Sequence, residues 1–222
     1  MTTDLEKSVK YRFLAGFNRQ IPQISKGYAE NEAAVLLLEL PSYTIHALLK
    51  EFYLSDNERS TIMFSKQVEQ LKKMKEANDG NRHFFDWVVG LDLFGDELGY
   101  PFCPFVAYEF IKFVGDARKH NSSFGMRIHA AENVPFIRPE LPGYRLFAVH
   151  MYILYRCIDF IKKKLRMHIR IGHGIAFDKL LSIKNYANRK SSVLVAEIQR
   201  NAKSIFSSIP FEVNITSNFY LL

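Results

Sequence analysis

The sequence has few cysteines and none of the compositional extremes that mark fibrous or disulfide-rich chains. Its 222 residues include two cysteines, eight prolines and eleven glycines. The glycine and proline content excludes a collagen-like chain. Cys103 and Cys157 cannot build a disulfide framework and lack the paired spacing of a cysteine-rich zinc site, which fits a reducing compartment.

The sequence also lacks a long uncharged apolar run. The longest candidate, 146–161, is interrupted by His150, Arg156 and Asp159, which favours a buried helix over a membrane span. The first ten residues contain no apolar segment of a secretory signal, so we expect a cytoplasmic protein without a membrane partner. The net charge of +7 favours anionic partners. It does not require nucleic acid, because the basic residues within 162–166 are typical of a solvated helix end.

What the sequence does contain is an alternation of short apolar runs and longer helix-like segments. This alternation is typical of βα units with a mostly parallel sheet, and so predicts an α/β fold. The runs predicted as strands are 10–17, 87–94, 126–130, 168–172 and 211–215. The segments predicted as helices are 32–38, 55–80, 104–119, 144–165 and 191–206. No repeat or low-complexity linker divides the chain, so we expect a single domain over residues 1–222.

Polar residues follow several of the predicted strands, where the working residues of βα proteins gather. His129 and Glu132 lie at the end of the strand 126–130, and His173 follows the strand 168–172. A histidine at such a position can bind a metal or transfer a proton near neutral pH. Glu132 is either a proton donor in a dry pocket or a capping acid at the start of the next helix.

The strand 87–94 supplies two further candidates. Asp92 either orients a neighbouring side chain or pairs with a lysine. Gly95 either lets a ligand approach the backbone or is an ordinary turn glycine. The other histidines are interpreted as surface or satisfied core residues, namely His46, His83, His120, His150 and His168.

Four segments occur in an order that resembles the adenosine deaminase family, including its AMP deaminase and growth-factor-type relatives. They are VVGLDLFGDE at 88–97, MRIHAAEN at 126–133, RIGHGIAF at 170–177 and FEVNITSN at 211–218. The resemblance implies a TIM-type (β/α)₈ barrel with one Zn²⁺ at its carboxyl-terminal mouth. It also implies hydrolytic removal of the 6-amino group from adenosine or a related purine nucleoside or nucleotide.

The resemblance also implies a role for each candidate. His129 would be a zinc ligand, and Glu132 would be the acid that protonates the purine ring nitrogen. His173 would orient or deprotonate the attacking water. Gly95 would offer its backbone N–H to the purine, with Asp92 as a supporting residue of the same substrate-binding segment. Zinc lowers the pKa of bound water toward ~7, and an acid neutralises the charge that develops on the ring.

The sequence departs from the family pattern as well. Ala131 stands where the family usually has glycine, and neither the family's His-x-His pair of zinc ligands nor its Asp-Asp pair occurs. A catalytic zinc ordinarily has three protein ligands and a water. We therefore expect a partial barrel that lacks its first two strands and its last strand. Its connections are expanded at 20–80, and 133–164 is expected to be an insertion over the barrel mouth.

Three accounts explain such a chain. It is part of a longer deaminase, or it is completed by another chain or a homo-oligomer, or it is a catalytically inactive deaminase-like barrel that acts in binding or assembly. The presence of both Glu132 and His173 favours the first. The Pro-Cys-x-x-Cys motif of cytidine-type deaminases and the phosphate-binding and dinucleotide-binding fingerprints are absent, and we expect no nucleic-acid partner.

Overall fold

The described part of the chain forms one five-stranded, all-parallel sheet. The computed structural model describes residues 11–19, 64–81, 83–95, 97, 103–132, 142–174, 196, 199–200 and 206–212. The strand order is β1-β2-β3-β4-β5, so each strand pairs with the next one along the chain. The strands are β1 (Phe13–Asn18), β2 (Val88–Phe94), β3 (Gly125–Ala130), β4 (Ile169–His173) and β5 (Phe211–Glu212). The predicted α/β class is confirmed, and each strand overlaps its predicted run.

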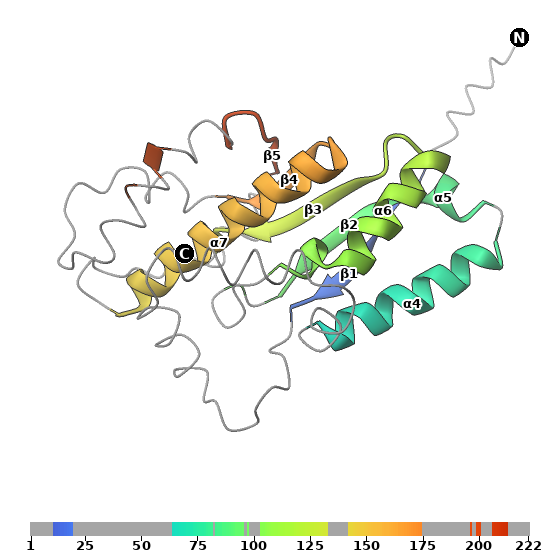
Figure 1. Ribbon diagram of the computed structural model, residues 1–222, viewed down its shortest axis with the longest axis horizontal. Helices are drawn as coiled ribbons and strands as arrows, with labels where there is room; N and C mark the ends of the chain where they lie inside the picture. The colour runs from blue at the N-terminus through green and yellow to red at the C-terminus, as the bar shows by residue number, and fades with distance from the viewer. Residues whose placement is uncertain are drawn as a thin grey trace, which may run out of the picture.

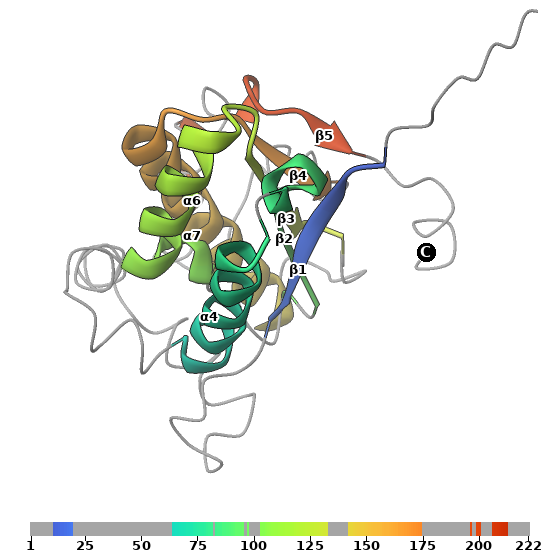
Figure 2. The ribbon, with the colours of Figure 1, turned by 90° about the vertical axis from the view of Figure 1, so that its right-hand side faces the viewer.

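Helices connect the strands in the manner of βα units (Figure 1). They are α4 (Ser65–Asp79), α5 (Phe84–Trp87), η1 (Pro104–Val106), α6 (Tyr108–His120) and α7 (Pro142–Leu165). Figure 2 shows α4, α6 and α7 on one side of the sheet. The predicted helix at 32–38, the segment 55–63 and most of 191–206 lie outside the described residues.

The alternation of side chains along β3 decides which residues face the helices. Met126, Ile128 and Ala130 are buried, whereas Arg127 and His129 between them are only partly buried. Successive side chains of a strand point to opposite faces, so the apolar set lies beneath the helices. Arg127 and His129 therefore lie on the other face of the sheet.

The core between the sheet and the helices is rich in phenylalanine. Phe17 of β1 makes edge-on contacts with Phe105 and Phe110, with ring centroids 5.7 and 5.1 Å apart. Such aromatic pairs contribute about 0.5–1.5 kcal/mol each beyond the area that they bury. The second half of α7 packs into the same core through Met151, Ile153, Leu154, Cys157, Ile158 and Ile161.

The burial of α7 agrees with the prediction that the apolar run 146–161 is a buried helix, for its described side chains. None of the helices in the described residues combines the length and the apolar content that a membrane crossing requires.

Two free cysteines that are distant in sequence come together in this core. Burial and a hydrogen bond with Cys157 raise the pKa of the Cys103 thiol well above its ordinary value.

The prediction of an insertion over the barrel mouth at 133–164 is wrong for its helical part. Residues 142–165 form α7, which packs against α6 and η1 on the helical side of the sheet. α7 is the crossover between β3 and β4, and parallel strands require a connection of a dozen or more residues. The length of this segment therefore reflects an ordinary βαβ connection. Residues 133–141 lie outside the described part.

Candidate metal centre

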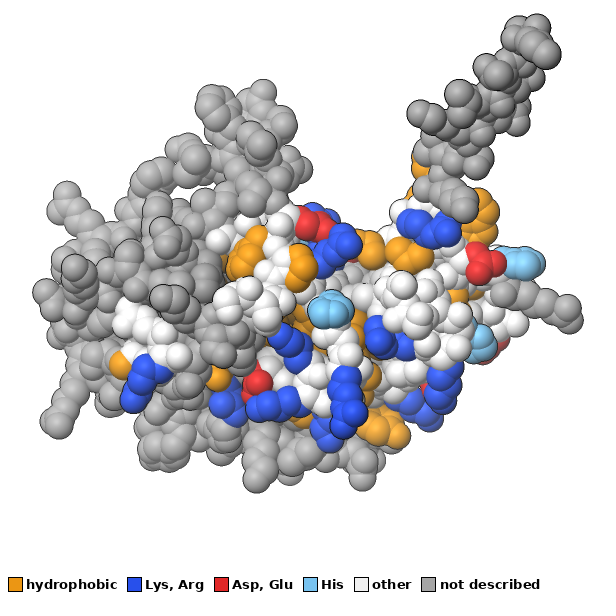
Figure 3. Space-filling view, turned by 90° about the horizontal axis from the view of Figure 1, so that it is seen from above, with side chains coloured by type: hydrophobic (Ala, Val, Ile, Leu, Met, Phe, Trp, Pro, Cys, Tyr) orange, Lys and Arg blue, Asp and Glu red, His pale blue; other side chains and the backbone are white. Residues whose placement is uncertain are grey.

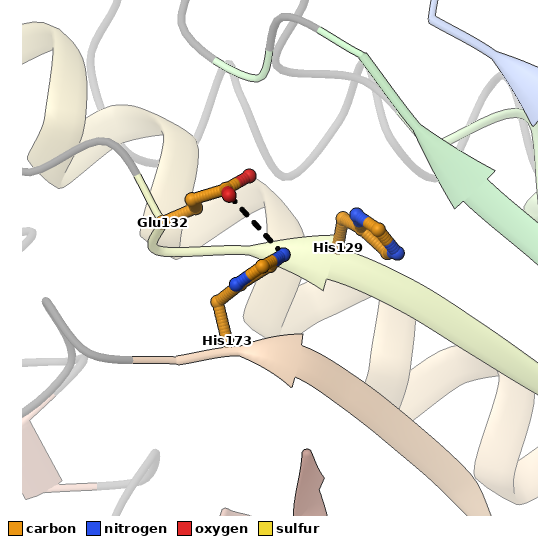
Figure 4. Close-up of side chains that lie close together, drawn as sticks. All are labelled: His129, Glu132 and His173. Atoms are coloured by element: carbon orange, nitrogen blue, oxygen red, sulfur yellow. Dashed lines mark ion pairs between the residues drawn. The ribbon is translucent and has the colours of Figure 1, made fainter. Parts of the chain in front are cut away.

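Three polar side chains meet where β3 and β4 end. His129 lies in β3, Glu132 follows that strand by two residues, and His173 is the last residue of β4. Each offers one ligand atom, and these atoms all lie within 4.8 Å of one another. Figure 4 shows Glu132 and His173 pointing toward each other, with the ring of His129 beside them. These three residues, here the His–Glu–His group, could hold a metal ion.

The distances within the group fit either an ion pair or a shared metal. Glu132 Oε1 lies 3.3 Å from His173 Nε2, and the rings of His129 and His173 lie 5.0 Å apart at 77°. Two atoms that each lie 2.0–2.1 Å from a tetrahedral zinc are roughly 3.3–3.4 Å apart. The separation of Glu132 and His173 therefore requires little rearrangement for both to bind one ion.

Two non-glycine residues with left-handed backbone shape the group. Ala131 has φ 56° and His173 has φ 72°. This conformation costs a residue with a Cβ roughly 1–2 kcal/mol. The Gly174 N–H donates to the Ala130 carbonyl at 2.9 Å, which joins the ends of the two strands. Ala131 is also the position at which the sequence departs from the resembled family, and glycine would adopt its conformation without this cost.

Asp92 of β2 lies beside His129. Its Oδ1 is 3.3 Å from His129 Nε2, and its Oδ2 is 3.4 Å from Arg127 Nη1. The two facing atoms, Asp92 Oδ1 and His129 Nε2, are buried and make no hydrogen bond within the described structure. A carboxylate beside one imidazole nitrogen fixes the orientation of the ring. Asp92 thus contacts both an imidazole and a basic side chain, and its predicted role stays a prediction.

The charged contacts continue along the same face of the sheet. Arg127 Nε lies 2.7 Å from Glu212 Oε2, and Arg170 Nη1 lies 2.8 Å from Glu212 Oε1. These ion pairs join β3, β4 and β5 side by side. They hold the short strand β5 to the strands that carry His129 and His173.

Gly95 follows β2 at the same edge of the sheet but is not brought into the group by any contact recorded for the described residues. Its φ is 100°, and a Cβ at this position would collide with the side chain of Asn18. Glycine is therefore required by the turn itself. Its substrate-binding role stays a prediction.

Two buried charged residues beneath the group were not assigned a role from the sequence. Glu97 Oε2 accepts a hydrogen bond from the Ala131 N–H at 2.6 Å, and its Oε1 accepts one from the Glu132 N–H at 2.8 Å. Arg19 Nη2 donates to the His129 carbonyl at 2.6 Å. The only signal in the sequence was the position of Glu97 just after a strand.

The described histidines outside the group have ordinary surroundings, as predicted. His83 pairs with Asp86 at the surface, and the ring of His120 stacks on Phe85. His168 is exposed at the opposite end of β4 from His173. The side chains of His46 and His150 lie outside the described residues.

The basic residues at the end of α7 have partners. Lys163 pairs with Asp159 at 2.6 Å, and Lys162 donates to Ser208 at 2.8 Å. Figure 3 shows Lys and Arg side chains at several separate places on the viewed face, with acidic side chains between them.

Comparison of the chain with protein-family models, with curated proteins and with solved structures finds no match.

Proposed function

We propose that this chain is part of a zinc-dependent enzyme that hydrolyses the 6-amino group of adenosine or a related purine nucleoside or nucleotide. The observation that carries the proposal is the meeting of His129, Glu132 and His173 at the ends of adjacent parallel strands. These are the residues to which the resemblance to adenosine deaminases assigns the metal and the proton transfers. They lie 44 residues apart at most, yet their ligand atoms come within 4.8 Å.

The strand order supports a (β/α)₈ barrel as the complete fold. Doubly wound sheets reverse their strand order at a switch point and carry helices on both faces. Here the order is sequential, and α4, α6 and α7 lie on one face (Figure 2). In a barrel the other face lines the interior. Arg127 and His129 lie on that face, so the group would open at the carboxyl-terminal mouth.

The residues present fit a zinc ion. Two imidazoles and a carboxylate are common zinc donors, and the ligand atoms of the three residues all lie within 4.8 Å of one another. In the deaminase arrangement His129 is the ligand, and further ligands come from strands outside the matched segments. Zinc supplies a Lewis acid that lowers the pKa of water toward ~7.

Glu132 and His173 perform the proton transfers in this proposal. Glu132 donates a proton to the purine ring nitrogen as water adds to the neighbouring carbon, which neutralises the charge that develops there. His173 orients the water and accepts its proton. Their side chains are 3.3 Å apart, so both reach the same small volume. His173 then returns its proton to the amino group, which leaves as ammonia, and the proton of the new hydroxyl passes to the Glu132 carboxylate, which leaves the inosine-type product.

The test is ammonia release from adenosine and from AMP by the full-length protein in the presence of zinc. We expect turnover that falls by roughly 10²–10⁴-fold in Glu132→Gln, the range of general acid catalysis. Glu69→Gln, an exposed acid of α4, is the matched control and should retain activity. No ammonia from either substrate would contradict the proposal. Purine binding that survives both Glu132→Gln and His173→Gln would favour the inactive binding barrel instead.

A further inference from the structure

Two oppositely charged side chains are buried beneath the loop that carries Glu132. Arg19 follows β1 and is 6% exposed, and Glu97 follows β2 and is 2% exposed. Charged side chains are almost never buried to this degree unless they are paired or hydrogen-bonded. The hydrogen-bond partners of Arg19 and Glu97 therefore indicate why these two side chains are buried.

Both side chains bind the backbone of one short segment, 129–132. Arg19 donates to the His129 carbonyl at 2.6 Å. Glu97 accepts hydrogen bonds from two successive amides, Ala131 N–H at 2.6 Å and Glu132 N–H at 2.8 Å. Hydrogen bonds to an ionised group are short and roughly twice as strong as neutral ones. The backbone between His129 and Glu132 is thus held from both sides.

The left-handed Ala131 makes the arrangement of Glu97 possible. A left-handed residue can turn successive N–H groups toward one point and create a small anion-binding concavity. Ala131 has φ 56°, and the carboxylate of Glu97 occupies the concavity made by the amides of Ala131 and Glu132. The strain at Ala131 is therefore matched by two charge-assisted hydrogen bonds. Without them nothing recorded for the described residues would fix the amide of Glu132.

We propose that Glu97 is a positioning residue for the His–Glu–His group, and that Arg19 assists it from the carbonyl of His129. Glu97 fixes the backbone from which the Glu132 side chain departs, and so sets the 3.3 Å approach of Glu132 to His173. The inference deepens the proposed function and rests on it for its catalytic meaning. The position of Glu132 relative to His173 can be tested separately, in the metal-free protein.

The experiment compares the full chain with Glu97→Gln. Glutamine has the same shape, but its NH₂ group replaces one carboxylate oxygen, so in the same orientation it meets one of the two amide N–H groups with a donor and that hydrogen bond is lost. The readout is the imidazole NMR resonances of His129 and His173 in the metal-free protein, together with the Kd for Co²⁺ from its visible absorption. Glu69→Gln is the control, since Glu69 is exposed and pairs with Lys73.

We expect Glu97→Gln to shift the resonances of both imidazoles and to raise the Kd for Co²⁺ by about 10–100-fold, as loss of an outer-shell partner does. The control should change neither. A merely structural role predicts a lower unfolding midpoint with unchanged resonances and Kd, and that result overturns the inference. Glu97→Asp, which keeps the charge but shortens the reach, gives a second variant if Glu97→Gln does not fold.

The two proposals fail separately. If the unmodified protein does not bind Co²⁺, the proposed metal function fails, and the inference is judged on the imidazole resonances alone. If Co²⁺ binds and both variants of Glu97 leave the resonances and the Kd unchanged, the inference fails while the proposed function stands.

Discussion

Gly172 of β4 provides a way to displace His129 without removing it. A Cβ placed on Gly172 would lie 2.8 Å from Cδ2 of the His129 ring and 3.3 Å from its Cγ and Nε2. Carbon atoms in contact are about 3.5–4.0 Å apart. Gly172→Ala therefore forces the ring to move by roughly 0.7 Å or more, while every donor atom of the group stays in the chain.

The expected effect follows from the tolerance of metal sites. Ligand distances in such sites hold within about 0.2 Å, so a displacement several times larger weakens binding. We expect Gly172→Ala to raise the Kd for zinc at least ~10-fold, which is about 1.4 kcal/mol. Overpacking should also lower the free energy of unfolding by roughly 1–3 kcal/mol.

Gly125→Ala is the matched control on the neighbouring strand. Gly125 is also a strand glycine, but its Cβ would meet only the Ser123 carbonyl oxygen, at an ordinary 3.7 Å. Isothermal titration with zinc and urea unfolding should show a near-normal Kd and stability for this variant. Equal zinc affinities for Gly172→Ala and Gly125→Ala would refute the packing of His129 against Gly172 as a determinant of the site.

Three further predictions concern stability. Ala131→Gly removes roughly 1–2 kcal/mol of left-handed strain and adds about 0.4–1 kcal/mol of unfolded-chain entropy. Urea unfolding should therefore show a gain of between about 0 and 1.6 kcal/mol, and a clear loss would contradict the strain. Ile128→Ala empties a fully buried position beneath the helices and should cost about 2–5 kcal/mol in the same assay, whereas a cost under about 1 kcal/mol would contradict the assigned core. The folded-state pKa of Cys103 is raised by burial, so the stability that this thiol contributes is complete below its unfolded pKa of roughly 8.5 and is lost as the pH rises through the folded value. Between pH 8 and pH 10, the free energy of unfolding should therefore fall less for Cys103→Ala than for the unmodified protein. An identical fall in both proteins would count against this linkage.

The strands and the central residues of the site were accessible from sequence for a physical reason. Apolar runs bounded by polar residues are a local signal, and parallel strands bring their carboxyl ends to one edge of the sheet. His129 and His173 were therefore predicted to share that edge, and their rings lie 5.0 Å apart. Asp92 was predicted either to orient a neighbour or to pair with a lysine, and it contacts both His129 and Arg127.

The supporting contacts could not be found in this way, because they join segments without a common local pattern. Glu97 bonds to an amide 34 residues away, and Arg19 bonds to a carbonyl 110 residues away. The approach of Cys157 to Cys103 depends on how α7 packs against η1. The segment 133–164 was predicted to be an insertion although a helix was predicted at 144–165, and the pairing of β3 with β4 identifies that helix as the crossover between them.

Zinc titration of the purified protein tests most directly whether the His–Glu–His group is a metal centre. The account predicts one zinc per chain, with the affinity greatly reduced in His129→Ala, which loses the ligand, and less reduced in His173→Ala, whose imidazole acts on the water. His168→Ala, an exposed histidine at the other end of β4, should bind zinc as the unmodified protein does. Failure of the unmodified protein to bind zinc, or full affinity in His129→Ala, would contradict the account.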